Sequence, residues 1–145
     1  MILYLAADLL WASKIKGTAE ALGIPCRPVR TLEMLEARLA EAATAIDSCA
    51  GVISATNGAT ASSSESSTLR ALVLDLDKPD EAMAMIARVR REERWRGVRV
   101  VCFGPHVAKE LFQQARDAGA DEVLPRGALD ARMEDVLLKL ESGAR

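Results

Sequence analysis

The sequence predicts one α/β domain in which five strands alternate with five helices. Short apolar runs of strand length recur along the chain, and the stretches between them carry apolar residues at helical spacing. The 145 residues are 50% apolar and 28% charged, which is typical of one globular domain that buries a core without disulfide or metal support. Because strands that alternate with helices pair in parallel through right-handed crossovers, we expect a sheet covered by helices on both faces.

The predicted strands occupy residues 2–7, 24–29, 70–76, 98–103 and 121–125. The first, third and fourth are apolar along nearly their whole length, as strands buried on both faces are. The second contains Pro25 and Pro28, and the fifth ends in Pro125. Since proline cannot donate a hydrogen bond to a neighbouring strand, these two strands belong at the sheet edges. The flavodoxin-like, doubly wound order 2-1-3-4-5 satisfies this condition and places the switch point between the first and third strands.

The predicted helices follow the strands in turn. The clearest begins after Gly104-Pro105 and ends at Gly119, which matches the preference for proline near a helix start and glycine past its end. Its apolar face is formed by Val107, Leu111, Ala115 and Ala118. A last helix carries an apolar stripe of Met133, Val136, Leu137 and Leu140. The other three helices are expected at residues 9–22, 31 to about 46, and 79 to about 94.

One segment, residues 48–68, does not fit a compact strand and helix unit. Its sequence, SCAGVISATNGATASSSESST, is a low-complexity tract of small and polar residues. It joins the second helix to the third strand, so we expect it at the amino-terminal edge of the sheet, opposite the switch point. We interpret it as a flexible Ser-rich insertion, with a regulatory or partner-docking tract as the alternative. The chain is thus read as a single domain, 1–145, without an output domain.

Composition excludes several classes of function. No apolar run approaches the roughly 20 residues of a membrane helix, and residues 1–12 lack the features of a secretory signal. The balance of 19 Lys and Arg against 21 Asp and Glu argues against a dedicated nucleic-acid binder. Cys26, Cys49 and Cys102 lie far apart and show no paired metal-ligand spacing, so we expect small buried side chains. The sequence favours a cytoplasmic protein with no nucleic-acid and no membrane partner.

Carboxylates follow the two strands that flank the expected switch point. Asp8 comes just after the first strand, and Asp75 ends the third, with Asp77 two residues later. Such a cluster can hold a hard cation or supply a nucleophile. The segments ALVLDLDKP, ending at Pro79, and GADEVLPR, ending at Arg126, are similar to the phosphoacceptor strand and the fifth strand of receiver domains of bacterial response regulators. The resemblance covers nearly the whole chain outside the insertion.

The resemblance assigns Asp75 to the phosphoacceptor position and Gly104 and Arg126 to two switch positions. Receiver domains carry a hydroxyl residue where this chain has Gly104, and a lysine where it has Arg126, which is followed here by Gly127 in place of the usual proline. His106, a lone histidine near the expected helix start, is a candidate for the edge of the site. No residue is assigned a catalytic role.

The metal ligands of the family are also replaced. Its acidic pair at the end of the first strand corresponds to Ala6 and Ala7, so only Asp8 and Asp77 remain as ligands for Mg²⁺. Because Mg²⁺ requires near-octahedral oxygen ligation, we expect it to bind weakly. No other cofactor is indicated.

These features favour a stand-alone, atypical (pseudo-)receiver domain that is not an enzyme and acts through protein contacts with little or no Asp phosphorylation. Its partner would be a histidine kinase or a second copy bound through the 106–140 face. One alternative is a working response regulator phosphorylated on Asp75 by a histidine kinase. A second is a small-ligand carrier at the switch-point crevice, although no G-x-G-x-x-G motif follows the first strand.

Two further features of the sequence are candidates for recognition surfaces. Residues 88–99 read RVRREERWRGVR, with six arginines around Trp95. We interpret them as a solvated helix end whose cations complement the helix dipole, with docking to a protein or a nucleic acid as alternatives. Trp11, Lys14 and Lys16 on the first helix are a second candidate, although Trp11 can equally pack inward.

Overall fold

The computed structural model describes residues 2–51 and 69–142 and contains one five-stranded parallel sheet in the order β2-β1-β3-β4-β5. This is the predicted strand order. The strands are β1 (Ile2–Leu5), β2 (Cys26–Pro28), β3 (Ala71–Asp75), β4 (Arg99–Gly104) and β5 (Glu122–Pro125). The proline-containing strands β2 and β5 are the edges, as expected from the missing donors. The predicted insertion lies outside the described residues, apart from its first four positions, which continue the preceding helix.

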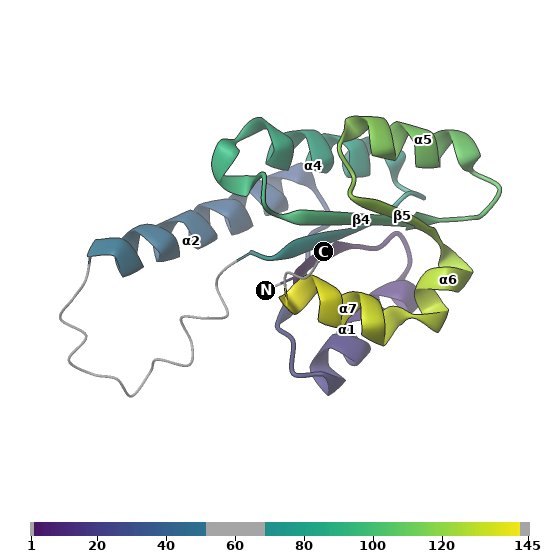
Figure 1. The fold of residues 1–145 in the computed structure, drawn as a ribbon, viewed down its shortest axis with the longest axis horizontal. Helices are drawn as coiled ribbons and strands as arrows, with labels where there is room; N and C mark the ends of the chain where they lie inside the picture. The colour runs from purple at the N-terminus through teal and green to yellow at the C-terminus, as the bar shows by residue number, and fades with distance from the viewer. Residues whose placement is uncertain (1, 52–68, 143–145) are drawn as a thin grey trace.

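Helices cover both faces of the sheet, as Figure 1 shows. On one face lie α2 (Leu32–Gly51), α4 (Pro79–Arg91) and α5 (Lys109–Ala118), and on the other lie α1 (Leu9–Ala21) and α7 (Met133–Ser142). A short helix, α6 (Arg126–Ala131), leads from β5 to α7. None of the described helices is long and apolar enough to cross a membrane.

The described residues therefore contain six α-helices, and the prediction of five is wrong in its last element. One helix was expected there, but the chain breaks at Arg132, whose backbone leaves the helical region at φ −117° and ψ 20°. The Arg132 amide closes α6 by donating to the carbonyls of Ala128 and Leu129. The break lets α6 begin at the end of β5 while α7 packs beside α1.

Alternating strand side chains divide the core into two layers. Leu3, Leu72 and Cys102 belong to the layer under α2, α4 and α5, whereas Tyr4 and Phe103 belong to the layer under α1 and α7. Both faces of the central strands are buried, which explains why these strands appear as continuous apolar runs in the sequence. Of the described cysteines, Cys102 is buried as predicted but Cys26, on an edge strand, is only half-buried.

The start of α5 differs from the prediction. The helix begins at Lys109, and before it the Ala108 amide donates to the Pro105 carbonyl in a turn. Val107, predicted to face the core, lies in this turn and is 74% exposed. The end of the helix is as predicted, because Gly119 adopts a φ of 122° that side chains rarely tolerate.

Although the arginine-rich segment is highly charged, one of its arginines, Arg90, makes specific contacts within the domain. Arg90 donates to the carbonyls of Gly119, Arg96 and Val98 and forms an ion pair with Asp121 at 2.7 Å. It thereby joins α4 to the loops before β4 and β5.

A short 3-10 helix, η3 (Glu93–Trp95), follows α4, and Trp95 at its end is only 3% exposed. Trp95 therefore packs into the core and offers little surface to a partner. The neighbouring Arg88 pairs with Glu36 of α2, and its hydrogen bond lowers the pKa of that carboxyl.

Candidate functional site

The carboxyl ends of β1, β3 and β5 lie at one edge of the sheet because the strands are parallel. Asp75 and Arg126 come together at this edge. Asp75 is the last residue of β3 and pairs in register with Phe103 of β4. Its side chain is 0% exposed, and it is the one buried charged residue among the described positions. A carboxylate in such a place needs hydrogen-bond donors to compensate for lost hydration.

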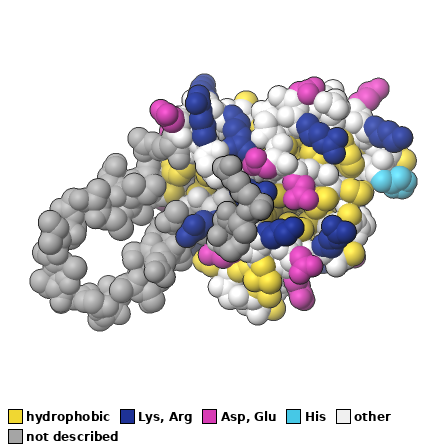
Figure 2. Space-filling view, in the orientation of Figure 1, with side chains coloured by type: hydrophobic (Ala, Val, Ile, Leu, Met, Phe, Trp, Pro, Cys, Tyr) yellow, Lys and Arg dark blue, Asp and Glu magenta, His cyan; other side chains and the backbone are white. Residues whose placement is uncertain are grey.

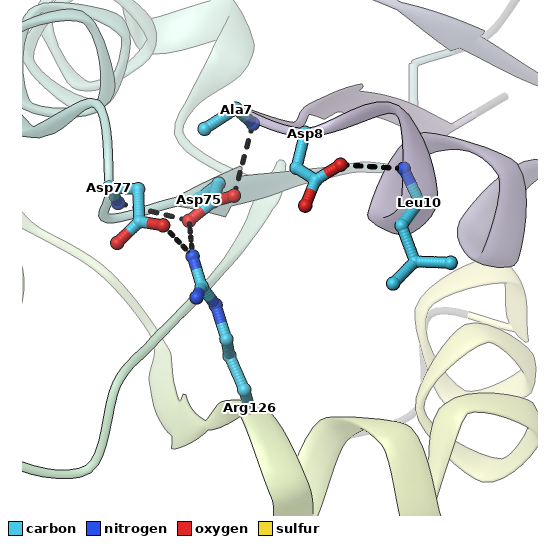
Figure 3. A network of polar contacts seen from close by, with 6 residues as sticks. All are labelled: Ala7, Asp8, Leu10, Asp75, Asp77 and Arg126. Atoms are coloured by element: carbon cyan, nitrogen blue, oxygen red, sulfur yellow. Dashed lines mark hydrogen bonds and ion pairs between the residues drawn. The ribbon is translucent and has the colours of Figure 1, made fainter.

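Three donors supply that compensation, as Figure 3 shows. The Ala7 amide donates to Oδ2 of Asp75 at 3.0 Å, and the Asp77 amide donates to Oδ1 at 2.9 Å. The Arg126 guanidinium donates from Nη2 to the same Oδ1 at 3.2 Å. Both oxygens of Asp75 are thus engaged, and its negative charge lies against a guanidinium.

Arg126 is the first residue of α6 and bridges two carboxylates. Its Nη2 also pairs with Oδ2 of Asp77, which is itself 39% exposed. Burial acts to lower the pKa of Arg126, but the hydrogen bonds and charges of Asp77 and Asp75 outweigh it, so that the pKa is raised. The Nε atom of Arg126 is buried and has no hydrogen-bond partner among the described residues.

Trp11 supports this bridge from α1. Its ring centroid lies 5.9 Å from Cζ of Arg126 and 5.3 Å from the ring centroid of Phe103. The guanidinium therefore lies near the face of an indole as well as beside two carboxylates. The sequence left open whether Trp11 faces solvent or the interior; the structure places it half-buried against the site. The sequence feature that could have placed Trp11 at the site is its position in the first turn of the helix, three residues after Asp8.

Asp8 lies at the same edge but turns away from this cluster. It is the N-cap of α1, and its Oδ1 accepts a hydrogen bond from the Leu10 amide at 2.8 Å. No contact found among the described residues joins Asp8 to Asp75 or Arg126 (Figure 3). The exposed His106, in the turn after β4, is likewise outside the cluster.

The carboxylates do not form a set suited to a divalent cation. Asp8 caps a helix, Asp77 pairs with Arg126, and the half-buried Ala6 and exposed Ala7 have no side-chain oxygen. Within residues 2–51 and 69–142, no group of three or more His, Cys, Asp or Glu side chains is arranged to hold a metal ion. The described residues therefore do not fit the Mg²⁺ site that the resemblance to receiver domains implies.

Gly104 is buried at the end of β4, beside Pro125 of β5. A Cβ atom added to Gly104 would lie 3.0 Å from Cβ of Leu76 and 3.5 Å from the ring of Phe112. A side chain at Gly104 would therefore be crowded by Leu76, whereas its contact with Phe112 would be ordinary.

Comparison of the sequence with protein-family models and with curated proteins finds no match. Solved structures do match, over nearly the whole chain. A response regulator from Thermotoga maritima superposes with a TM-score of 0.65 at 13% identity, covering 97% of this chain and 96% of that one. The receiver domain of NtrX from Brucella abortus gives a TM-score of 0.65 at 14% identity, covering 98% of both chains.

A third match is the receiver domain of the sensor histidine kinase PA1611 from Pseudomonas aeruginosa PAO1, whose structure has a magnesium ion coordinated in the active site cleft. Its TM-score is 0.60 at 15% identity, and the match covers 97% of this chain and 96% of that one. The superpositions show a shared fold, and sequence identities this low support no conclusion beyond the fold. The chain has the flavodoxin-like fold of receiver domains, as the sequence predicted.

Proposed function

We propose that this chain is an atypical receiver domain that signals through protein contacts, with little or no phosphorylation of Asp75. The state of Asp75 carries the proposal. A nucleophilic carboxylate must present a lone pair to the incoming phosphoryl group. Asp75 is 0% exposed, and its two oxygens already accept three hydrogen bonds, one of them from Arg126. Attack through Oδ1, which accepts two of these hydrogen bonds, would require Arg126 to leave, and Oδ2 is held by the Ala7 amide.

The surroundings of Asp75 also lack the groups that assist phosphoryl transfer. That reaction depends on cations that neutralise charge developing on the equatorial oxygens of the transferred group. Ala6 and Ala7 supply no ligands for such a cation, and the carboxylate of Asp77 is committed to Arg126. Arg126 carries one positive charge of its own, but that charge is shared between Asp75 and Asp77.

The conformational switch of the family has no counterpart here. Gly104 carries no hydroxyl that could follow a phosphoryl group, and a Cβ atom there would lie 3.0 Å from Cβ of Leu76. Without this switch, a partner would meet the same surface at all times. We therefore propose a constitutive interaction.

The 106–140 face is the surface we assign to that interaction, with a second copy of the chain as the first candidate partner. It comprises α5, the edge strand β5, and the helices α6 and α7. Its exposed charged side chains are of both signs: Lys109, Glu110, Arg116, Asp117, Asp121, Glu122, Asp130, Arg132, Glu134, Asp135 and Lys139. Figure 2 shows Lys and Arg side chains interspersed with Asp and Glu side chains on the side of the molecule that carries α5 and α6. A surface of mixed charge can pair with a copy of itself around a two-fold axis.

Intact-mass spectrometry after incubation with Mg²⁺ and acetyl phosphate tests the proposal. We expect that incubation changes neither the mass of the wild-type chain nor the mass of Asp75→Asn. A variant that restores the family residues, with Ala6→Asp, Ala7→Asp and Arg126→Lys, should gain mass on Asp75 if the missing groups are the cause. Addition of one phosphoryl group to the wild type, lost in Asp75→Asn, would contradict the proposal and favour a working response regulator.

A further inference from the structure

We infer that a cleft beside the Asp75 cluster binds a small organic phosphate. The cleft lies at the carboxyl edge of the sheet, between the end of β1, the first turns of α1 and the residues that follow β2. Its volume of about 550 Å³ is within the range of about 300–1,000 Å³ that is usual for small-molecule sites. Lys78, which follows β3, brings the cleft next to the reversal of strand order between β1 and β3, where ligands of open α/β sheets bind.

Three cations from three different segments line this cleft. They are Lys16 on α1, Arg30 after β2, and Lys78 after β3. Arg30 and Lys78 form no ion pair with any described residue, and the Nζ of Lys16 is 3.9 Å from a carboxylate oxygen of Glu20. The one carboxylate in the lining is Asp8, and one of its oxygens already accepts the Leu10 amide. The cleft thus has an excess of positive charge, which an anion would neutralise.

The remaining lining determines what kind of anion fits. Leu9, Ala12 and Pro28 provide accessible apolar surface, while the hydroxyl of Ser13 adds a hydrogen-bonding group. Arg30 presents a planar fork of donors that matches the oxygens of a phosphate. A ligand with a phosphate at the cations and a carbon or ring portion against the apolar surface would use both parts.

Because Ala6 and Ala7 have small, uncharged side chains, they leave room in the cleft and add no negative charge to it. Both residues line it, and both stand where receiver domains carry acidic residues that favour a cation. With alanine at these positions, no side-chain carboxylate opposes an anion there. This inference concerns the cleft alone and holds whether or not Asp75 can be phosphorylated.

Proton–nitrogen correlation spectra of the full chain test the inference by titration. The probes are adenosine monophosphate, ribose 5-phosphate and phenyl phosphate, compared with adenosine and inorganic phosphate. We expect saturable shifts at the amides of Ala6, Ala7 and Ser13 with at least one organic phosphate, and a Kd at least about tenfold weaker for adenosine and for inorganic phosphate.

Matched variants locate the binding. Arg30→Ala and Lys78→Ala should each weaken the Kd about tenfold or more, whereas Arg27→Ala should leave it unchanged, because Arg27 is exposed nearby on β2 but does not line the cleft. Preserved spectra of the free variants establish that they fold. The inference would be overturned by the absence of saturable shifts with all three organic phosphates, by equal affinity for inorganic phosphate, or by binding that is unaffected in Arg30→Ala and Lys78→Ala.

Discussion

Replacing Arg126 with methionine tests the central ion pair of the site, because methionine keeps an apolar stem but removes the guanidinium. The change leaves the carboxylate of Asp75, which is 0% exposed, with two backbone donors and no countercharge. A hydrogen bond to a charged group contributes about 1.5–3 kcal/mol. The pair with the exposed Asp77 adds less than about 1 kcal/mol. We expect the free energy of unfolding to fall by about 2 kcal/mol.

A double-mutant cycle isolates the interaction between Asp75 and Arg126. In an Asp75→Asn background the buried charge is absent, so Arg126→Met should cost about 1 kcal/mol or less, mostly from contacts with Trp11 and Asp77. The coupling energy between the two positions should therefore be about 1–2 kcal/mol. Residues that do not interact usually give additive effects to within about 0.5 kcal/mol.

Urea unfolding followed by far-ultraviolet circular dichroism measures each variant, and a thermal melt should show a decrease of roughly 4–8 °C for Arg126→Met. Arg132→Met is the matched control, because Arg132 is exposed at the end of the same helix. Its effect should be within about 0.5 kcal/mol of zero. If the two arginine variants were equally stable, or if the cycle were additive, Arg126 would not compensate the charge of Asp75 and the proposed function would lose its main support.

Arg90→Lys should lower the free energy of unfolding by about 2–3 kcal/mol in urea titrations, because a lysine cannot bond three carbonyls and a carboxylate together. The control Arg91→Lys, on the exposed side of α4, should change the free energy of unfolding little. Equal effects of the two substitutions would contradict the role assigned to Arg90. Burial raises the pKa of Cys102 from 9.0 to about 12, so the unfolded thiol ionises first as pH rises and stability should fall by up to about 1.4 kcal/mol per pH unit above about pH 9. Cys102→Ala should remove this part of the slope in urea titrations between about pH 8 and 10.5, and an unchanged slope would show that the thiol does not contribute. Sedimentation velocity should detect a weak dimer that dissociates at high salt and with Arg132→Glu and Glu134→Arg combined, independently of phosphodonor. A monomer at all concentrations, or a dimer insensitive to both changes, would contradict self-association through the 106–140 face.

The strand order could be predicted because burial leaves a local trace in the sequence. Strands covered on both faces are apolar at every position, and prolines such as Pro28 and Pro125 are tolerated only at edges. Once the order was known, parallel pairing placed Asp75 and Arg126 at the same edge. The element boundaries followed less closely, because the ends of helices depend on which carbonyls and amides find partners. The turn that exposes Val107 and the break at Arg132 are of this kind.

The sequence pattern did not predict which side chains contact one another. Asp8 was expected beside Asp75 but caps α1, and Arg126 reaches both Asp75 and Asp77 while lying near the ring of Trp11. These choices depend on rotamers and on distances between residues more than 40 positions apart in the chain. The sequence therefore determined which residues share the edge of the sheet, because strand direction alone places them there. Folding in three dimensions decided which charges neutralise each other and which cations line the cleft, because both depend on packing between segments whose local sequences carry no mutual signal.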